Sequence, residues 1–249
     1  MTDARAPGGA RGAVAFLTPI GGASVPSPRS LAWFPAVGAG IGAALGGAWW
    51  GLSKFWPAAV VAAVVVGLDL VVTGMLHVDA LVDAADGLLP HLARERRLAV
   101  MREPAVGAFG IAAGGIVLIA RWAALFATRP SVLLLVALWT ASRTAMAVAA
   151  TAVPYARADG EGLATAFLGS RRPGWAASAL GVPVAVVAAV FAHRGSPAAG
   201  PVALLCGAVA AFCVVRLAVR RVGGFTGDVL GASGVALETV GLLVAAGRW

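Results

Sequence analysis

The chain has 249 residues, of which 60% are hydrophobic and 12% are charged, and its mean hydropathy is +0.89. A water-soluble globule of this length does not need so apolar a composition, so most of the apolar surface is expected to face lipid. The formal net charge of +8 would suit nucleic-acid binding by a soluble protein, but the arginines cluster in short segments between apolar stretches. This spacing favours membrane orientation as their role and argues against a nucleic-acid partner.

The first 30 residues contain Arg5, Arg11 and Arg29 and several prolines before any long apolar stretch begins. This order lacks the layout of a cleaved signal peptide. We therefore predict that residues 1–30 form a cytoplasmic N-terminal arm. A single transmembrane helical domain over residues 31–249 is expected to follow it.

Apolar stretches of nearly bilayer length recur along the rest of the chain. They predict about seven transmembrane helices, at residues 31–50, 57–75, 109–128, 131–153, 175–193, 201–219 and 233–247. The predicted fold class is therefore all-α, a polytopic integral membrane helical bundle of the cytoplasmic (inner) membrane. If the N-terminus is cytoplasmic, most arginines also fall on the cytoplasmic side, as the positive-inside rule requires. The active site is expected there, in the polar loops 76–108, 154–174 and 220–232.

The segment over residues 73–87 carries Asp79, Asp83 and Asp86 at positions i, i+4 and i+7. On a continuous helix the three carboxylates share one face, where they repel unless a cation or a proton relieves them. Mg²⁺ usually takes a few carboxylates together with water and substrate phosphate. The pattern therefore predicts a Mg²⁺ site, against the alternative of a solvated helix end. His77 in the same segment is a ligand, a base or an interfacial polar residue.

Arg96 and Arg102 belong to a basic stretch that leads, through Gly107, into the third predicted helix. Arginine forks fit phosphate oxygens, and the amino terminus of a helix favours anions. These residues are candidate phosphate contacts. The competing explanation is topology, because arginines next to membrane helices occur in most polytopic proteins.

Asp228, preceded by Gly227, lies in a predicted glycine-rich bend that lets backbone approach a ligand closely. It is a second candidate source of metal-binding oxygen. Glu238 and Arg143 fall inside apolar segments, where an unpaired charge costs about 3 kcal/mol. We therefore expect both to point into the bundle, where one partners the other or the substrate. Asp69 is predicted to be a further polar group of the bundle interior.

Taken together and in this order, these segments resemble cobalamin synthase, the membrane enzyme family also called adenosylcobinamide-GDP ribazoletransferase. The specific parts are the His-x-Asp-x3-Asp-x2-Asp-Gly run that begins at His77 and the Gly-Gly-x-Thr-Gly-Asp-x-Leu-Gly run that begins at Gly223. The resemblance covers nearly the whole chain. One departure is Ala80, which stands where glycine is usual and is expected to narrow the space for a closely approaching ligand.

The resemblance implies a late step of cobalamin (vitamin B12) biosynthesis. In this step the phosphocobinamide group of adenosylcobinamide-GDP is transferred to the 3′-hydroxyl of α-ribazole or α-ribazole 5′-phosphate, and GMP is released. The expected partners are these substrates and membrane lipid. A second copy of the chain and other late cobalamin-assembly enzymes are further candidate partners.

On this basis we assign roles to the candidate residues. Mg²⁺ is the expected cofactor, with the ligands Asp79, Asp83, Asp86 and Asp228. The proton acceptor is expected among Asp83, Asp86 and His77. The expected substrate contacts are Arg102, Arg143, Arg96, Arg171, Gly107 and Gly227.

Two other function classes are alternatives. A CDP-alcohol-type phosphotransferase of lipid synthesis also uses an aspartate cluster and Mg²⁺, but its usual Asp-Gly-x2-Ala-Arg spacing is absent here. An ion-coupled membrane transporter would use Asp69, Arg143 and Glu238 as an intramembrane ion path. Against a transporter, the carboxylates concentrate at one edge and no internal repeat is apparent.

Overall fold

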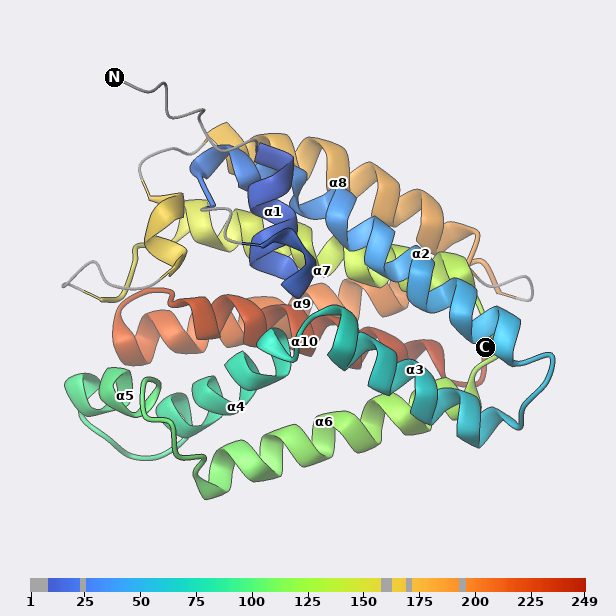
Figure 1. Cartoon of the computed structure of the whole chain (residues 1–249), viewed down its shortest axis with the longest axis horizontal. Coiled ribbons are helices and arrows are strands. Elements are labelled where there is room, and N and C mark those ends of the chain that lie inside the picture. The colour runs from blue at the N-terminus through green and yellow to red at the C-terminus, as the bar shows by residue number, and fades with distance from the viewer. Residues whose placement is uncertain (1–8, 23–25, 158–162, 169–171, 193–195) are drawn as a thin grey trace.

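The computed structural model describes residues 9–22, 26–157, 163–168, 172–192 and 196–249. Its α-helices, shown in Figure 1, are α1 (Gly9–Leu17), α2 (Phe34–Leu52), α3 (Ala58–Val72), α4 (Leu76–Leu88), α5 (Arg94–Val100), α6 (Ala108–Ala127), α7 (Val132–Ala152), α8 (Arg172–Val190), α9 (Ala199–Val222) and α10 (Gly227–Ala245). Short 3-10 helices cover Pro19–Gly21, Pro28–Trp33 and Leu163–Phe167. The only β pairing in the described ranges is an isolated bridge between Tyr155 and Phe225, so the all-α prediction is confirmed.

Five of the described helices are long and apolar enough to cross a membrane. They are residues 28–52, which join Pro28–Trp33 to α2, and α6, α7, α9 and α10. Helices α3 and α4 meet the same test only as a pair, and they are bent by 87° at the break between them. The polytopic membrane bundle is thus confirmed. The number of crossings and the side of the N-terminus remain predictions.

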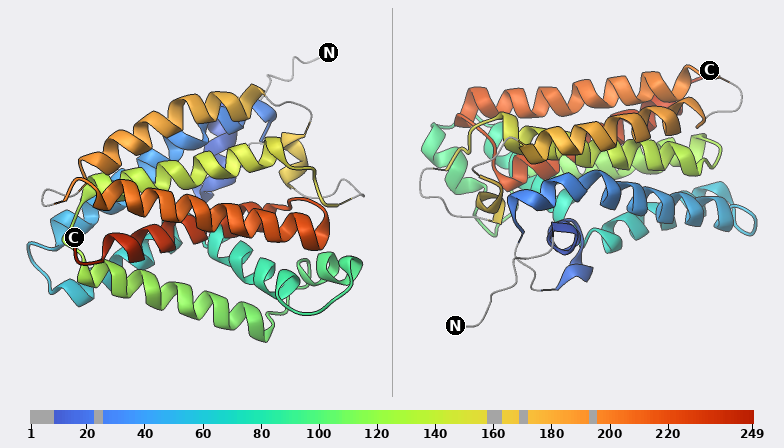
Figure 2. Two further views of the ribbon diagram at one scale, coloured as in Figure 1. Left: turned by 180° about the vertical axis from the view of Figure 1, so that it is seen from behind. Right: turned by 90° about the horizontal axis from the view of Figure 1, so that it is seen from above.

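The long helices lie side by side along the longest axis of the molecule, with α7 packed against α2, α8, α9 and α10 (Figures 1 and 2). The contact between α2 and α7 is unusually close. Gly38, Gly42 and Gly46 of α2, spaced four apart on one helix face, lie against the α7 backbone between residues 132 and 139. Small residues at this spacing let two membrane helices approach backbone to backbone.

Helix α1 packs on the bundle and is not a separate arm. Its Ala13 and Leu17 are fully buried, and Phe16 contacts the rings of Phe34 and Phe167. The apolar side chains recur at helical spacing and need cover from the bundle. The predicted boundary at residue 30 therefore does not separate two structural units.

All three predicted loops contain helix, and in two of them the helix carries predicted site residues. Residues 76–108, predicted as a loop, form α4 and α5, so the three aspartates of this segment do lie on one continuous helix. Helix α10 begins at Gly227 and not at Ser233, because the hydroxyl of Thr226 accepts a hydrogen bond from the Val229 N–H (3.3 Å) and caps the helix. Asp228 therefore lies in the first turn of a helix, and not in a bend.

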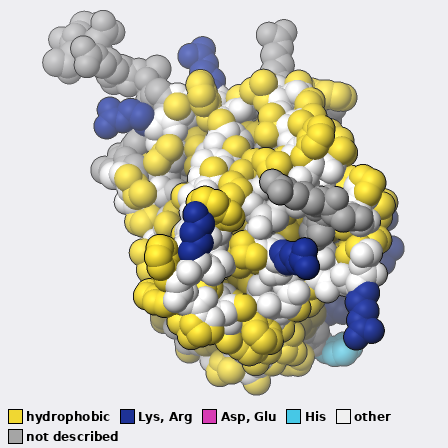
Figure 3. All heavy atoms as spheres, turned by 90° about the vertical axis from the view of Figure 1, so that its right-hand side faces the viewer, with side chains coloured by type: hydrophobic (Ala, Val, Ile, Leu, Met, Phe, Trp, Pro, Cys, Tyr) yellow, Lys and Arg dark blue, Asp and Glu magenta, His cyan; other side chains and the backbone are white. Residues whose placement is uncertain are grey.

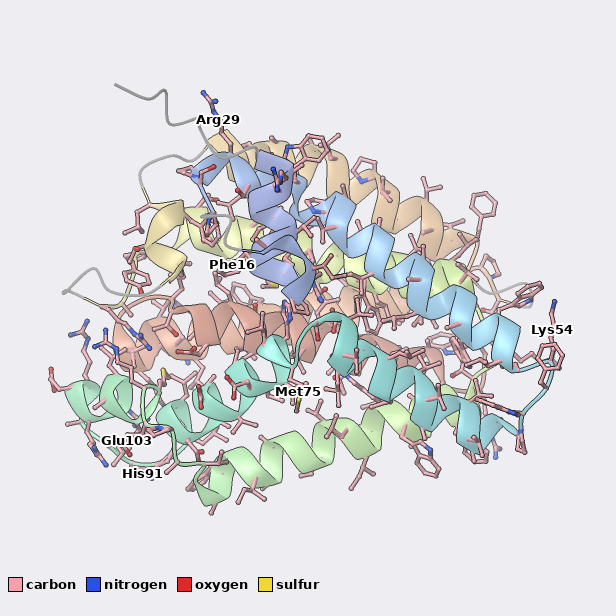
Figure 4. The ribbon with its side chains drawn as sticks, in the orientation of Figure 1. Phe16, Arg29, Lys54, Met75, His91 and Glu103 are labelled. Atoms are coloured by element: carbon pink, nitrogen blue, oxygen red, sulfur yellow. The ribbon has the colours of Figure 1, made fainter. Side chains whose placement is uncertain are left out.

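The charged side chains lie mainly at the two ends of the bundle. We call the end that holds α5 and residues 220–226 the polar end, because its arginines gather there. Figure 4 shows His91 and Glu103 at the polar end and Lys54 at the opposite end. The face seen in Figure 3, at that opposite end, shows many hydrophobic side chains among backbone and other atoms, with a few Lys and Arg side chains.

Candidate functional site

The acidic segment is placed by the break between α3 and α4. Gly74 and Met75 both have left-handed backbone conformations, with φ of +59° and +60°. Glycine adopts this conformation freely, whereas methionine does so at a cost of about 1 kcal/mol or more. The turn directs α4 between α6 and α10, against both of which it packs.

A cavity of about 250 Å³ lies between α1, α4, α7 and α10. Its charged and imidazole side chains are those of His77, Asp79, Arg157 and Asp228. The rest of its lining is small, apolar or aromatic and consists of Ala15, Phe16, Leu76, Ala80, Met146, Tyr155, Ala164, Gly227 and Gly231. The fold thus brings four of the predicted site residues together, from two segments that are far apart in the sequence. Ala80 also lines this cavity. It contacts Gly231 of α10 so closely that a Cβ added at Gly231 would lie 2.5 Å from the methyl carbon of Ala80.

The carboxylates around the cavity repel one another. Asp79 is exposed and Asp83, one turn further along α4, is half-buried. The negative charges of Asp79, Asp228 and Asp86 all act on Asp83. A bound cation or a proton relieves such crowding. Part of the relief comes from Arg157, whose Nη2 lies 3.1 Å from Oδ2 of Asp228.

Asp86 faces the start of α6. Its two carboxylate oxygens accept hydrogen bonds from the backbone N–H groups of Gly107 (2.7 Å) and Gly110 (2.9 Å). A carboxylate here satisfies free N–H groups and complements the positive end of the helix dipole. Asp86 therefore fastens α6 to α4. Gly107, predicted to contact substrate, contacts Asp86.

His77 is buried, with 6% of its surface exposed, and its Nδ1 has no hydrogen-bond partner among the described residues. Buried polar atoms usually have a hydrogen-bond partner, so this nitrogen is available to form a hydrogen bond with a group bound in the cavity. The position agrees with a polar role in the site.

The predicted arginines are placed differently from one another. The positive charge of Arg102 acts on Asp228. Arg96 is exposed and pairs with Glu103 at 2.6 Å. Arg171 lies outside the described residues. Arg157 was missed as a site residue, because nothing in its local sequence separates it from arginines that orient the membrane.

Behind the cavity lies a buried charge network that joins α3, α6, α7 and α10. Arg121 donates to Asp69 (2.5 Å) and to Glu238 (2.6 Å). Arg143 also pairs with Glu238, which confirms that these two residues point into the bundle and meet. Trp139 donates its indole N–H to Asp69 (3.1 Å). Only 1% of Arg143 is exposed, so its predicted contact with phosphate does not fit this position.

The donor set of the cavity suits a hard divalent cation. Over the described ranges, no three His, Cys, Asp or Glu side chains converge closely enough to hold a metal ion by themselves. Mg²⁺ commonly binds to only one or two carboxylates, with water and substrate phosphate completing its shell. Asp79 and Asp228, which line one cavity, fit this chemistry.

The fold and the cavity define a polytopic helical membrane protein with a carboxylate-lined site near its polar end. Residues 9–246 match the family model described as cobalamin-5-phosphate synthase. The chain therefore belongs to the cobalamin-5-phosphate synthase family, as the sequence motifs predicted.

Curated relatives agree with this assignment. The chain is 38% identical to a protein of Chlorobium phaeovibrioides (82% of this chain, 81% of the relative) and 37% identical to one of Chlorobaculum tepidum (87% and 85%). It is 37% identical to a protein of Deinococcus radiodurans (82% and 70%). Each relative is named adenosylcobinamide-GDP ribazoletransferase. No solved structure gives a significant match.

Proposed function

We propose that this protein transfers the phosphocobinamide group of adenosylcobinamide-GDP to the 3′-hydroxyl of α-ribazole or its 5′-phosphate and releases GMP, late in cobalamin synthesis. The observation that carries this proposal is the convergence of Asp79, Asp228 and Arg157 on one cavity in a chain of this family. Carboxylates and an arginine fork are the groups with which proteins hold a cation and phosphate oxygens.

The reaction is a displacement at phosphorus. The ribazole hydroxyl oxygen attacks the phosphorus bonded to the cobinamide arm, the bond from that phosphorus to the oxygen of GMP breaks, and GMP leaves with the electron pair. In this scheme Asp83 accepts the hydroxyl proton. The nearby negative charges of Asp79 and Asp228 favour protonation of its carboxylate. Arg157 and Arg102 stabilise the negative charge of the diphosphate.

The same proposal assigns Mg²⁺ to Asp79 and Asp228, with Asp83 beside them. When bound, Mg²⁺ would neutralise charge that builds on the diphosphate. Asp86 acts indirectly, by holding α6 against α4 through Gly107 and Gly110. We also propose that the polar end faces the cytoplasm, because the arginines gather there.

The test is GMP release by purified protein supplied with Mg²⁺, adenosylcobinamide-GDP and α-ribazole. We expect Asp83→Asn to lower the turnover rate about 100-fold or more, in the range typical of lost acid–base catalysis. Glu103→Gln, which changes an exposed carboxylate paired with Arg96, is the matched control and should keep the wild-type rate. Full activity of Asp83→Asn would exclude its proposed role, and absence of GMP release by the wild type would overturn the proposed function.

A further inference from the structure

The cavity has two chemically different walls. Asp79, Asp228 and Arg157 form a charged wall. The rings of Phe16 and Tyr155 line another part of the cavity, which we call the aromatic wall. It is completed by the aliphatic side chains of Ala15, Leu76, Met146 and Ala164. A ligand that fills this space must therefore combine an apolar part with a part that suits cations and carboxylates.

Phe16 is held in place by rings behind it. It stacks on Phe34 with ring centroids 5.7 Å apart, and it meets Phe167 edge-to-face at 4.8 Å. Phe34 and Phe167 are almost fully buried and contact each other at 5.7 Å. Aromatic pairs of this geometry are favourable beyond the area that they bury, so the ring of Phe16 is fixed before any ligand arrives.

Tyr155 is also held in place by a ring, that of Phe225 in the segment between α9 and α10. Its ring meets the fully buried ring of Phe225 at 5.3 Å and an interplanar angle of 66°. The backbone of this region is fastened as well, because Phe225 N–H donates to Pro154 C=O and Ala156 N–H donates to Phe225 C=O, both at 2.9 Å. The cavity thus offers two supported aromatic rings next to its carboxylates.

We propose that the aromatic wall binds the base of α-ribazole and that Phe16 and Tyr155 are specificity-determining residues for it. This inference rests on the proposed function and names the substrate part that enters this cavity. A benzimidazole-like base is flat and almost entirely apolar, and its ribose carries the hydroxyl groups. Seated on the aromatic wall, it places the ribose towards the carboxylates.

The other parts of the two substrates fit this wall less well. The corrin ring system is too large for a cavity of about 250 Å³. Guanine is flat, but its edge carries several donors and acceptors that Ala15, Leu76, Met146 and Ala164 cannot satisfy, and unpaired polar groups are costly on burial. The benzimidazole-like base has a single free ring nitrogen, and His77, on the same cavity, has an unpaired Nδ1.

The test uses the full-length protein in detergent, with KM measured separately for α-ribazole and for adenosylcobinamide-GDP. We expect Phe16→Ala to raise KM for α-ribazole about tenfold, as loss of one base–aromatic stack does elsewhere. KM for adenosylcobinamide-GDP and inhibition by GMP should stay within about twofold. Tyr155→Leu should have the same selective effect. Phe55→Ala, which removes a 79% exposed ring at the opposite end, is the matched control.

Equal increases in KM for both substrates would overturn the inference, because a general loss of structure explains them. Weaker GMP inhibition with unchanged KM for α-ribazole would also overturn it, because the wall would then hold guanine. If the wild type releases no GMP, the proposed function fails by itself, and calorimetry with benzimidazole alone becomes the test. Binding by the wild type that Phe16→Ala abolishes would support the aromatic wall, and equal binding by both would overturn it.

Discussion

Asp79 and Asp86 lie two turns apart on the same face of α4, yet their surroundings give them different tasks. Asp79 is exposed on the cavity wall, whereas Asp86 is buried and both of its oxygens are bonded to the start of α6. The i, i+4, i+7 pattern predicted that the carboxylates share a helix face. It could not predict that α6 would occupy the last of them, because that contact depends on the packing of two helices.

Replacement of Asp79 should therefore damage activity without damaging the fold. We expect Asp79→Asn to lower the rate of GMP release about 100-fold or more, because a metal-binding oxygen is lost, while the thermal unfolding midpoint stays unchanged. Asp86→Asn should instead lower the unfolding midpoint, because an amide presents only one acceptor oxygen to Gly107 and Gly110. The reverse pattern, with Asp79→Asn unfolding early and Asp86→Asn stable, would contradict these assignments.

Gly107 provides a second test at this scale. A Cβ at residue 107 would lie 2.5 Å from Oδ1 of Asp86, so Gly107→Ala must displace the carboxylate. We expect a loss of about 1–3 kcal/mol in the free energy of unfolding, the cost of disturbing a buried hydrogen bond. Gly115→Ala, inside α6 and with open space around it, should be neutral or stabilising by up to about 1 kcal/mol. Chemical denaturation of both variants in detergent measures the difference.

At the scale of elements, hydropathy located the long helices well, because the length of an apolar stretch can be read from the local sequence alone. The helices α1, α4 and α5 could not be predicted in the same way, since they are short and partly polar and depend on the surfaces they cover. Arg121 was missed for a related reason. It stands alone in an apolar stretch, and only the fold reveals that Asp69 and Glu238 meet it there.

The buried charge network should hold α3, α6 and α10 together. Arg121→Met leaves two buried carboxylates without their shared partner, and breaking such a pair typically costs about 3–5 kcal/mol. The exposed Arg129 on the loop after α6 is the matched control, and Arg129→Met should change the free energy of unfolding by less than about 0.5 kcal/mol.

Adding Asp69→Asn to the Arg121→Met variant should recover part of the lost stability, because it removes the carboxylate that loses its arginine partner. Glu238 still pairs with Arg143 in that double variant. If the double variant is no more stable than Arg121→Met alone, the unpaired carboxylate at Asp69 is not the source of the loss.

At the scale of the whole molecule, the arginine-rich polar end predicts which side of the membrane the site faces. Single cysteines at Glu103 and at Lys54, in a background with Cys206 and Cys213 replaced by serine, report on the two ends. A membrane-impermeant thiol reagent added to intact cells should label Lys54→Cys and leave Glu103→Cys unlabelled. Labelling of Glu103→Cys from outside would place the acidic cavity on the wrong side for cytoplasmic nucleotides.

The corner at Gly74 and Met75 also solves a problem of length. Run as one straight helix, residues 58–88 would measure roughly 45 Å, well beyond a hydrocarbon layer of about 30 Å. The excess would carry Asp83 and Asp86 out into water, away from the first turns of α6 and α10. Because the chain turns by 87° between α3 and α4, α4 stays within the bundle. Its aspartates therefore remain next to the first turns of α6 and α10.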